Sequence, residues 1–330
     1  MSCSILQSNL FIIIISTRDL YQKFCHEEVD HLPLFFQPWY LDVVSQEYSW
    51  HPLVAQQEDK TLAIWPIYSK TKGPLSYATM PPFTPYLGPY VKPSSSLKNT
   101  SKYHYLKKQI IALQEQLPPL HYTTVHCTPE LEYPLSLFWS GSSLFSRYTY
   151  RLMLSSEADL WAGIESKQKN RIRNALQTHT CIESEETSIF YSLVEASFKR
   201  QGLPTPYKES LLKSYFKALR DHNAGRMSLA IDKDNNPVAG ILCVFDHRRV
   251  YLIATGLSSD HRDSHTISML IWDALKCFCS THEVFDFEGS MIPGIEKFFR
   301  SFGGTLTPYL RLESFSNMFI KLLFRIKQSL

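Results

Sequence analysis

Apolar and polar positions follow regular periods along most of the chain, and those periods predict a mixture of strands and helices. Short runs rich in β-branched and aromatic residues predict the strands of the first half, which are 11–15, 51–57, 61–69, 75–80 and 121–127. Apolar residues three or four positions apart predict its helices, which are 17–28 and 102–116. Residues 81–90 hold four prolines among aromatic side chains, so a packed loop is expected there.

The second half repeats the order of a strand, helices and further strands. Its expected strands are 148–154, 227–231, 238–246, 250–256 and 284–288. Its expected helices are 157–178, 188–200, 208–222, 265–280 and 295–302. Turn residues at 232–237 and 247–249 join the three middle strands, which are therefore predicted to be antiparallel. The pattern predicts an α+β protein with mixed central sheets flanked by helices.

Length and composition predict two lobes of similar size. The 330 residues exceed the roughly 100–200 that are usual for one domain. Hydrophobic residues make up 44% of the chain and charged residues 20%, which is typical of a globular protein. Residues 128–146 show no clear period, so the expected division is an N-terminal lobe at 1–146, a C-terminal lobe at 147–313 and an amphipathic helix at 314–330.

Charge and cysteine content narrow the partners and the compartment. A net charge of +3 is too balanced to predict binding of duplex DNA. The seven cysteines are scattered and odd in number, which favours a reducing compartment, and their spacing predicts no metal site. The apolar run at 11–15 is too short for a membrane span and lacks the basic flank of a signal peptide, so a cytoplasmic protein is predicted.

Four separated motifs carry a resemblance to a known family. They read FQPWYLD at 36–42, MPPFTPYLGP at 80–89, SKQKNRIRNA at 166–175 and FDFEGSM at 285–291, the last continuing to FGG at 302–304 and PY at 308–309. In these motifs and in the order of its elements, the stretch 10–313 resembles the FemAB/BioF2-like branch of the GNAT superfamily of acyltransferases. The resemblance implies tandem GNAT-like (acyl-CoA N-acyltransferase) lobes.

The same resemblance implies transfer of an acyl or aminoacyl group to an amine. The leading hypothesis is an N-acyltransferase that uses acyl-CoA as co-substrate, holds no covalently bound cofactor and acts by direct attack on the amine of a sugar or cell-envelope precursor. An enzyme that takes its group from aminoacyl-tRNA is the main rival, with tRNA as its partner. A GNAT-fold module that only binds an anionic glycan or nucleotide is the non-enzymatic alternative.

The expected donor site lies between the strand 250–256 and the helix that follows it. GNAT enzymes that use coenzyme A hold its pyrophosphate there with a glycine-rich loop, because backbone N–H groups at a helix start attract anions. This chain lacks those glycines. Arg262, Ser264 and Thr266 are the candidate phosphate ligands, although two aspartates in the same loop would repel a phosphate. A solvated turn in which Ser264 caps the helix is the alternative.

Lys169, Arg171 and Arg173 form a basic stretch within the expected helix 157–178. On an unbroken helix, Lys169 and Arg173 flank the apolar arc and Arg171 falls inside it. An inward arginine needs an anionic partner. The partner is either Asp286 or Glu288, or else a phosphate or carboxylate of the substrate. A solvated helix face is the general alternative for such a stretch.

Asp286 and Glu288 lie two residues apart in the expected strand 284–288, so alternation places both on one face. N-acyl transfer needs a base for the attacking ammonium and donors for the oxyanion. Glu288 is the candidate base, and Ser290 is a candidate donor. The structural alternative pairs Glu288 with Arg171 or Arg300.

Four further residues are candidates for substrate contacts. Lys297 and Arg300 share one face of the expected helix 295–302, where the resemblance implies a basic residue near the substrate; a surface pair is the alternative. Trp39 and Tyr86 are expected to line the acceptor groove, with packing between the lobes as the alternative.

The tail at 315–326 carries an apolar stripe beside basic residues. This pattern is typical of a helix that lies on a membrane surface, and equally of one that docks on the protein. Docking on the protein is the favoured interpretation.

Overall fold

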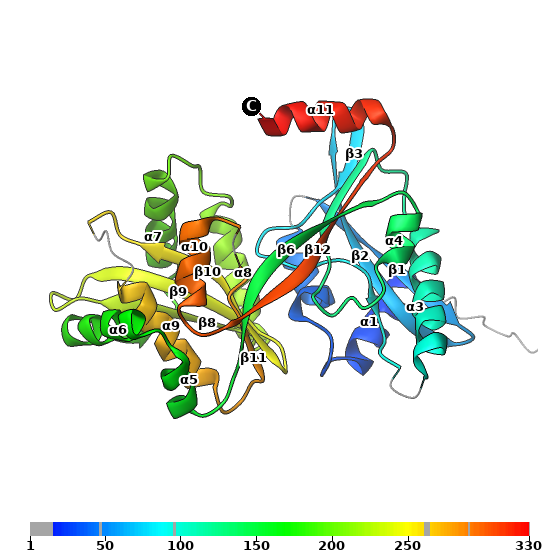
Figure 1. The fold of residues 1–330 in the computed structure, drawn as a ribbon. Helices are drawn as coiled ribbons and strands as arrows, with labels where there is room; N and C mark the ends of the chain where they lie inside the picture. Colours follow the sequence, from blue (N-terminus) through cyan, green and yellow to red (C-terminus); the bar gives the residue numbers. More distant parts are fainter. Residues whose placement is uncertain (1–15, 46–47, 95–96, 261–264, 290, 330) are drawn as a thin grey trace, which may run out of the picture.

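The computed structural model describes residues 16–45, 48–94, 97–260, 265–289 and 291–329. The expected strand at 11–15 lies outside these residues. Figure 1 shows two halves, each with helices against strands, joined by two long strands that run through the middle of the molecule. The predicted α+β class is confirmed, and the expected mixed central sheets form one large mixed sheet flanked by helices.

One sheet extends through both halves, in the order β1-β2-β3-β5-β12-β6-β11-β10-β9-β8-β7, with β4 added beside β2. The strands of the first half are β1 (Ser49–Gln57), β2 (Lys60–Lys72), β3 (Leu75–Ala78), β4 (Tyr90–Val91) and β5 (Tyr122–His126). Those of the second half are β7 (Thr180–Glu183), β8 (Gly225–Ile231), β9 (Pro237–Phe245), β10 (Arg249–Leu257) and β11 (Val284–Asp286). The predicted hairpin at 51–69 and the antiparallel strands at 227–256 are confirmed.

Two long strands connect the halves. They are β6 (Ser143–Met153) and β12 (Thr305–Phe315). β12 pairs with β6 from Thr305 to Glu313 and with β5 from Arg311 to Phe315, so the C-terminal strand completes the sheet of the first half. In Figure 1 these strands cross the centre in green and orange-red. The lobe boundaries stay a prediction, and both of them, 146/147 and 313/314, fall inside these strands.

Helices cover both halves of the sheet. In the first half they are α1 (Thr17–Glu27), α2 (Pro38–Val44), α3 (Asn99–Gln114) and α4 (Leu135–Trp139), with a 3-10 turn at Leu34–Phe36. In the second half they are α5 (Glu157–Gly163), α6 (Ser166–Thr178), α7 (Thr187–Arg200), α8 (Glu209–Asp221), α9 (His265–Phe278) and α10 (Pro293–Arg300). No helix among the described residues reaches the length and apolarity that a membrane crossing requires.

A single hydrophobic cluster spans the junction between the halves. Phe35 packs edge-on against Tyr251, with ring centroids 4.7 Å apart. Phe83, from the proline-rich loop, stacks flat on Tyr215 of α8 at 4.4 Å. The aromatic density of that loop therefore comes from packing against the second half.

The tail forms the helix α11 (Met318–Ser329), which lies across one end of the sheet at the top of Figure 1. Phe324 packs on Tyr122 of β5, with ring centroids 4.2 Å apart. Met318, Phe319 and Leu322 on the same helix are exposed. The helix therefore docks on the protein through one face, and contact with a membrane surface stays a prediction.

Two expected elements differ from the structure in a way that affects the site. The expected helix 157–178 is broken into α5 and α6 at Ile164, whose backbone is extended. The expected strand 284–288 ends at Asp286, because Glu288 has a φ of 57°. The strand alternation that was expected to place Asp286 and Glu288 on one face therefore does not continue to Glu288.

The sheet opens between β10 and β11. These strands are parallel and pair only where Arg249–Tyr251 meets Val284–Asp286. β10 then continues to Leu257 beside β9, with a register shift that leaves Ile253 unmatched, while the chain after β11 turns away. The two strands diverge from this point.

Candidate active site

A cavity of about 950 Å³ adjoins the place where β10 and β11 diverge. β10 contributes its residues 253–255 and 257, and the turn after β11 contributes Glu288 and Gly289. The remaining walls come from α7 and the segment 201–207 after it, from α10, from the proline-rich loop 80–85, and from single residues of α9, β5, β6 and β12. Both halves of the chain therefore line one cavity.

Glu288 reaches this cavity through a left-handed turn. Its φ is 57° and that of Gly289 is 52°, and a Cβ on Gly289 would overlap the Tyr148 carbonyl oxygen and the Thr149 Cα. Only glycine fits at position 289, because the turn lies directly against β6. The backbone N–H of Glu288 donates to Asp286 Oδ1 at 2.8 Å, which fixes the turn.

The surroundings of the Glu288 carboxyl favour its protonated form. Its Oε1 atom is buried and has no hydrogen-bond partner among the described residues. Burial, and then the nearby Asp286 carboxylate, raise the pKa of Glu288 well above the ordinary value of 4.5. A carboxyl with a raised pKa is a stronger base once it is ionised.

Asp286, by contrast, is fully buried and fully bonded. It accepts hydrogen bonds from Thr149 Oγ1 at 2.5 Å, from Arg151 Nε at 2.8 Å and from the Tyr86 hydroxyl at 3.1 Å. With the Glu288 N–H, these four donors satisfy the carboxylate. Asp286 is therefore a structural anion behind the cavity.

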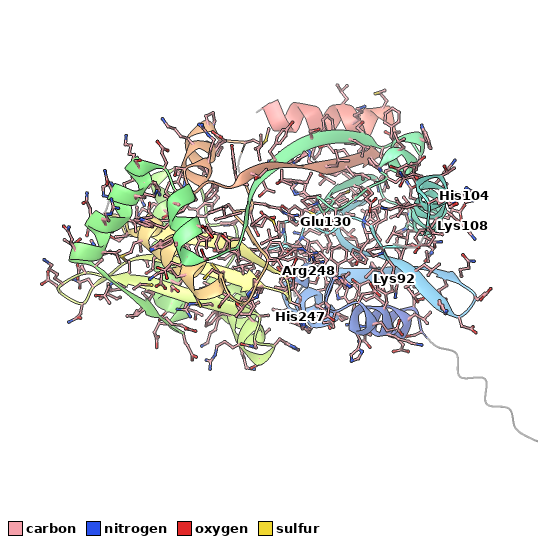
Figure 2. The ribbon with its side chains drawn as sticks, turned by 60° about the horizontal axis from the view of Figure 1, so that its bottom comes forward. Lys92, His104, Lys108, Glu130, His247 and Arg248 are labelled. Carbon is pink, nitrogen blue, oxygen red and sulfur yellow. The ribbon has the colours of Figure 1, made fainter. Side chains whose placement is uncertain are left out.

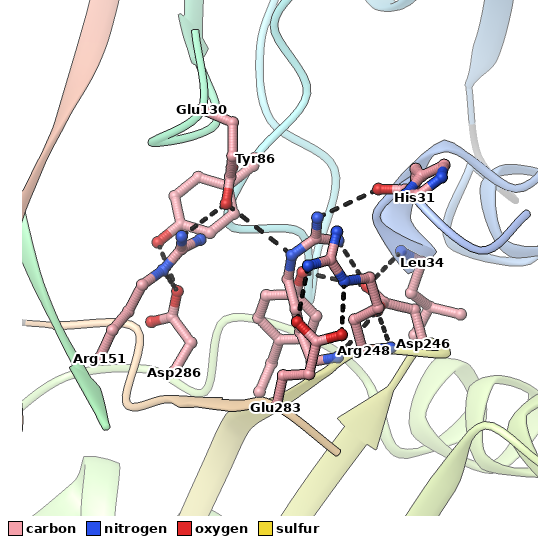
Figure 3. Close-up of polar contacts among 11 residues, drawn as sticks. His31, Leu34, Tyr86, Glu130, Arg151, Asp246, Arg248, Glu283 and Asp286 are labelled. Carbon is pink, nitrogen blue, oxygen red and sulfur yellow. Dashed lines mark hydrogen bonds and ion pairs between the residues drawn. The ribbon is translucent and has the colours of Figure 1, made fainter. Parts of the chain in front are cut away.

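The Asp286 ion pair belongs to a larger polar network between the halves (Figure 3). Arg151 also pairs with Glu130 at 2.6 Å, and Glu130 lies 3.8 Å from Arg249, which pairs with Asp246 at 3.2 Å. Burial alone would lower the pKa of Arg151, but Asp286 and Glu130 raise it above its ordinary value. Arg151 therefore keeps its charge, and the network joins the two halves beside the site.

Figure 2 views this region with the underside of Figure 1 turned forward. Glu130, Arg248 and His247 lie at the junction of the halves. Arg248 donates two hydrogen bonds to Glu283, at 2.9 and 2.6 Å, and both side chains are exposed. The Arg248–Glu283 pair is therefore exposed, whereas the Arg151–Asp286 pair is largely buried.

Comparison with known proteins identifies the family of the region that contains Glu288. Residues 166–300 match the family model described as an acetyltransferase (GNAT) domain. This part of the chain is a GNAT domain. The superfamily that the motifs predicted is thereby confirmed.

Solved structures extend the likeness over most of the chain. FemX has a TM-score of 0.68 at 13% sequence identity, covering 90% of this chain and 96% of that chain. The C-terminal domain of a putative lysylphosphatidylglycerol synthetase from Agrobacterium fabrum has a TM-score of 0.54 at 10% identity, covering 94% and 96%. L-PGS from Bacillus licheniformis has a TM-score of 0.52 at 10% identity, covering 88% and 96%. These likenesses show a shared fold. No curated protein sequence matches the chain.

The basic stretch of the GNAT domain lies on α6, away from the acids that were offered as its partners. Asp286 pairs with Arg151, and the partly buried Arg171 donates to Gln168 Oε1 at 3.0 Å. The premise of an unbroken helix, which put Arg171 inside the apolar arc, is wrong because the chain breaks before α6. Lys169 donates to the Ala162 carbonyl at 3.0 Å and so caps α5.

Arg173 is exposed and lies over the Trp161 ring at 5.3 Å. Lys297 and Arg300 are exposed on α10, and Arg300 donates to Glu296 at 3.0 Å. The cavity is lined instead by the opposite, apolar side of that helix, with Ile295, Phe298 and Phe299. None of these basic residues lines the cavity of the described structure, and their roles in binding stay predictions.

Trp39 and Tyr86 also lie outside the cavity wall. Trp39 stacks on His222 at 4.0 Å in a separate pocket of the junction, and Tyr86 is buried with its hydroxyl on Asp286. Both positions agree with the alternative of packing between the halves.

The expected donor residues are described only in part. Arg262, Ser264 and Ser290 lie outside the described residues. Thr266 lies in the first turn of α9, 2% exposed, and its hydroxyl has no hydrogen-bond partner among the described residues. Gly256 serves packing, because a Cβ there would meet the backbone of α7 at Val194.

Several polar residues of the cavity escaped the sequence prediction, and three of them come from the strands that join or complete the sheet of the first half. These three are His126 of β5, Arg147 of β6 and Tyr309 of β12. Tyr309 belongs to one of the family-like motifs, and Arg147 precedes Thr149 and Arg151 at a spacing of two. That spacing was a usable signal, since alternate strand residues share a face.

Proposed function

We propose that the protein is an N-acyltransferase, and that the cavity beside Glu288 holds the acceptor amine and the acyl group of the donor. The observation that carries the proposal is Glu288 itself. A buried carboxyl with a raised pKa and an unpartnered oxygen costs stability, and such groups concentrate at catalytic sites. Its place in a GNAT domain supports the same function.

The proposed reaction is one direct attack. The Glu288 carboxylate takes a proton from the acceptor ammonium, and the neutral amine attacks the acyl carbonyl. A tetrahedral oxyanion forms, the bond from the carbonyl carbon to the thiol or hydroxyl of the donor breaks, and that leaving group takes up a proton. The products are an amide and the free thiol or alcohol.

The bulge in β10 supplies a candidate oxyanion donor. Ile253 has no partner in the register of β10 with β9, and β11 has already ended its pairing at Tyr251. Ile253 also lines the cavity. We assign its backbone N–H the role of hydrogen-bond donor to the developing oxyanion, because bulges free such groups from the ladder.

An acyl-CoA-type thioester is the first donor we propose, bound where β10 ends and α9 begins. The unpartnered Thr266 hydroxyl in the first turn of α9 supports an anion site there. Aminoacyl-tRNA is the second candidate, favoured by the loop before α9, which lacks the glycines of a coenzyme A loop. The acceptor we propose is the amine of a sugar or a cell-envelope precursor.

The test compares turnover by the wild type, Glu288→Gln and Glu195→Gln, the last an exposed glutamate of α7 that does not line the cavity. Acyl-CoA thioesters and aminoacyl-tRNA are each incubated with amino-sugar acceptors, and amide formation is followed by mass spectrometry. Glu288→Gln is expected to lower kcat by about 10²–10⁴-fold, the usual contribution of a general base. Glu195→Gln is expected to match the wild type.

The pH profile adds an independent readout. The wild-type kcat/KM is expected to rise with pH through a limb above the ordinary glutamate range, because the pKa of Glu288 is raised. The residual activity of Glu288→Gln is expected to lack that limb. Wild-type protein that binds donors but forms no amide would favour the non-catalytic binding module instead.

A further inference from the structure

Arg147 differs from Arg151, Arg249 and Arg311 because it has no carboxylate partner among the described residues. It shares one face of β6 with Thr149 and Arg151, because alternate residues of a strand point the same way. Thr149 and Arg151 both bond to Asp286. Arg147 lies two residues earlier and lines the cavity.

Three arginines on β6, β10 and β12 have acidic partners. Arg151 pairs with Asp286, Arg249 with Asp246, and Arg311 with Glu313 at 2.8 Å. Arg147 forms no ion pair with the described residues, and its Nε is buried without a hydrogen-bond partner. A partly buried cation of this kind is costly unless an anion joins it.

The positive charge at this end of the cavity belongs to Arg147. His126 lies beside it, and burial, followed by the Arg147 charge, lowers the pKa of His126 to about 4. His126 Nδ1 lies 3.2 Å from the Pro85 carbonyl, which can only accept, so the neutral ring donates there. Arg311 is balanced by Glu313.

Tyr309 completes the group. It is the cross-strand partner of Arg147 in the pairing of β12 with β6, and it lines the same cavity. Burial raises the pKa of Tyr309, and a hydrogen bond from the Arg147 guanidinium, followed by its positive charge, opposes that rise. The Tyr309 hydroxyl can donate a hydrogen bond to a ligand that Arg147 binds.

We propose that Arg147 and Tyr309 form an anion-binding subsite, which binds a carboxylate or a phosphate group of the acceptor. Arginine suits either group, since its planar fork donates two parallel hydrogen bonds to both. The assignment of the bound anion to the acceptor rests on the proposed function. The binding of an anion at Arg147 is independent of that function.

The subsite lies close to the proposed base. The turn that carries Glu288 abuts β6 at Tyr148 and Thr149, and the Phe287 N–H donates to the Tyr150 carbonyl at 3.0 Å. Thr149 and Arg147 are two strand residues, roughly 7 Å, apart. The acceptor amine and its anionic group are therefore only a few bonds apart in the proposed substrate.

The binding test uses inorganic phosphate and succinate as probes, titrated at constant ionic strength while the melting temperature is followed. The wild type is expected to show a saturable rise with one or both probes. Arg147→Gln is expected to bind at least about tenfold more weakly. Arg248→Gln, which changes an exposed arginine outside the cavity, is expected to respond like the wild type.

The pattern of responses identifies the anion. A response to phosphate alone assigns a phosphate-bearing ligand, and a response to succinate alone assigns a carboxylate. Arg147→Lys is expected to recover part of the binding, because it restores the charge without the fork. A wild type that responds to neither probe, or an Arg147→Gln protein that responds as the wild type does, overturns the subsite.

A kinetic test links the subsite to the acceptor. With an anionic acceptor that the wild type uses, Arg147→Gln is expected to raise the acceptor KM about tenfold or more while kcat and the donor KM change little. An unchanged acceptor KM with weakened probe binding would contradict the assignment to the acceptor alone. Absence of turnover in the wild type would instead count against the proposed function, and the binding test would still decide the subsite.

Discussion

Asp286 and Glu288 are two carboxyls, two residues apart, with opposite environments. Asp286 accepts four hydrogen bonds, one of them within its ion pair with Arg151, whereas Glu288 Oε1 accepts none from the described residues. The environment of Glu288 favours its protonated form, whereas Asp286 is held by its donors. Each environment leads to a separate prediction about stability.

Glu288→Gln is expected to stabilise the protein at neutral pH. The folded state holds the Glu288 proton at pH values where the unfolded chain has lost it, so the wild-type free energy of unfolding falls as pH rises above 4.5. Glutamine removes that loss, by about 0.5–2 kcal/mol at pH 7–8. Urea unfolding of both proteins from pH 4 to pH 8 measures the difference, which should shrink toward pH 4. A variant less stable than the wild type at pH 8 would contradict the buried, unpartnered carboxyl.

Asp286→Asn is expected to destabilise the protein strongly. Removing one partner leaves Arg151 partly buried with Glu130 alone, and breaking a buried pair costs about 3–5 kcal/mol. The matched control is Glu283→Gln, which breaks the exposed pair with Arg248 and should cost at most about 1 kcal/mol. Urea unfolding at pH 7 compares the two variants. Equal losses of unfolding free energy in the two variants would show that the buried ion pair contributes no more to stability than the exposed one.

At the scale of elements, the turn at Glu288–Gly289 is what brings the carboxyl to the cavity. Gly289→Ala is expected to displace this turn, because alanine disfavours a φ of 52° and its Cβ would overlap β6. The expected result is a loss of about 1–3 kcal/mol and a fall in kcat/KM of about tenfold or more. Gly163→Ala is the control, since a Cβ there meets nothing within 4 Å. Full activity in Gly289→Ala would mean that the turn does not position Glu288.

The sequence predicted most regular elements but not their interruptions. The hairpin at 51–69 was predictable from two apolar runs with a polar turn, and the helix at 265–280 from its dense apolar spacing. β12 was missed, and it contains Pro308. Proline is tolerated because β12 has only β6 as a neighbour at Pro308, where no second ladder needs an N–H. That condition depends on pairing between distant segments.

The candidate site was predictable to the same degree. Glu288 followed from the chemistry of a family-like motif, yet its contact with the cavity depends on a left-handed turn that strand alternation does not foresee. The spacing of two between Arg147, Thr149 and Arg151 predicts that they share one face of a strand. Only Arg151 has acidic partners, Glu130 and Asp286, and Asp286 comes from a segment far along the chain. Partner choice among buried charges is a property of the assembled structure.

At the scale of the whole molecule, the two halves share a sheet, a core cluster and a charge network. β12 returns from the C-terminal half to pair with β5, so the sheet of the first half is completed by the last strand of the chain. Phe35 and Tyr251 pack across the junction, and Arg151 reaches Glu130 beside them. Neither half can leave the other without exposing apolar surface and unpairing buried charge.

We therefore expect one cooperative unfolding transition. The double variant Trp161→Phe/Trp272→Phe removes the tryptophans of the second half, which pack on each other at 4.8 Å, and leaves those of residues 39–139 as reporters of the first half. In urea, its tryptophan fluorescence and the far-ultraviolet ellipticity of the whole chain should change with the same midpoint and the same slope. Two separated midpoints would show that the halves unfold independently, and the shared strands would then not couple them. Coincident curves would mean that a destabilising substitution in either half lowers the free energy of unfolding of the whole chain, including the cavity that both halves line.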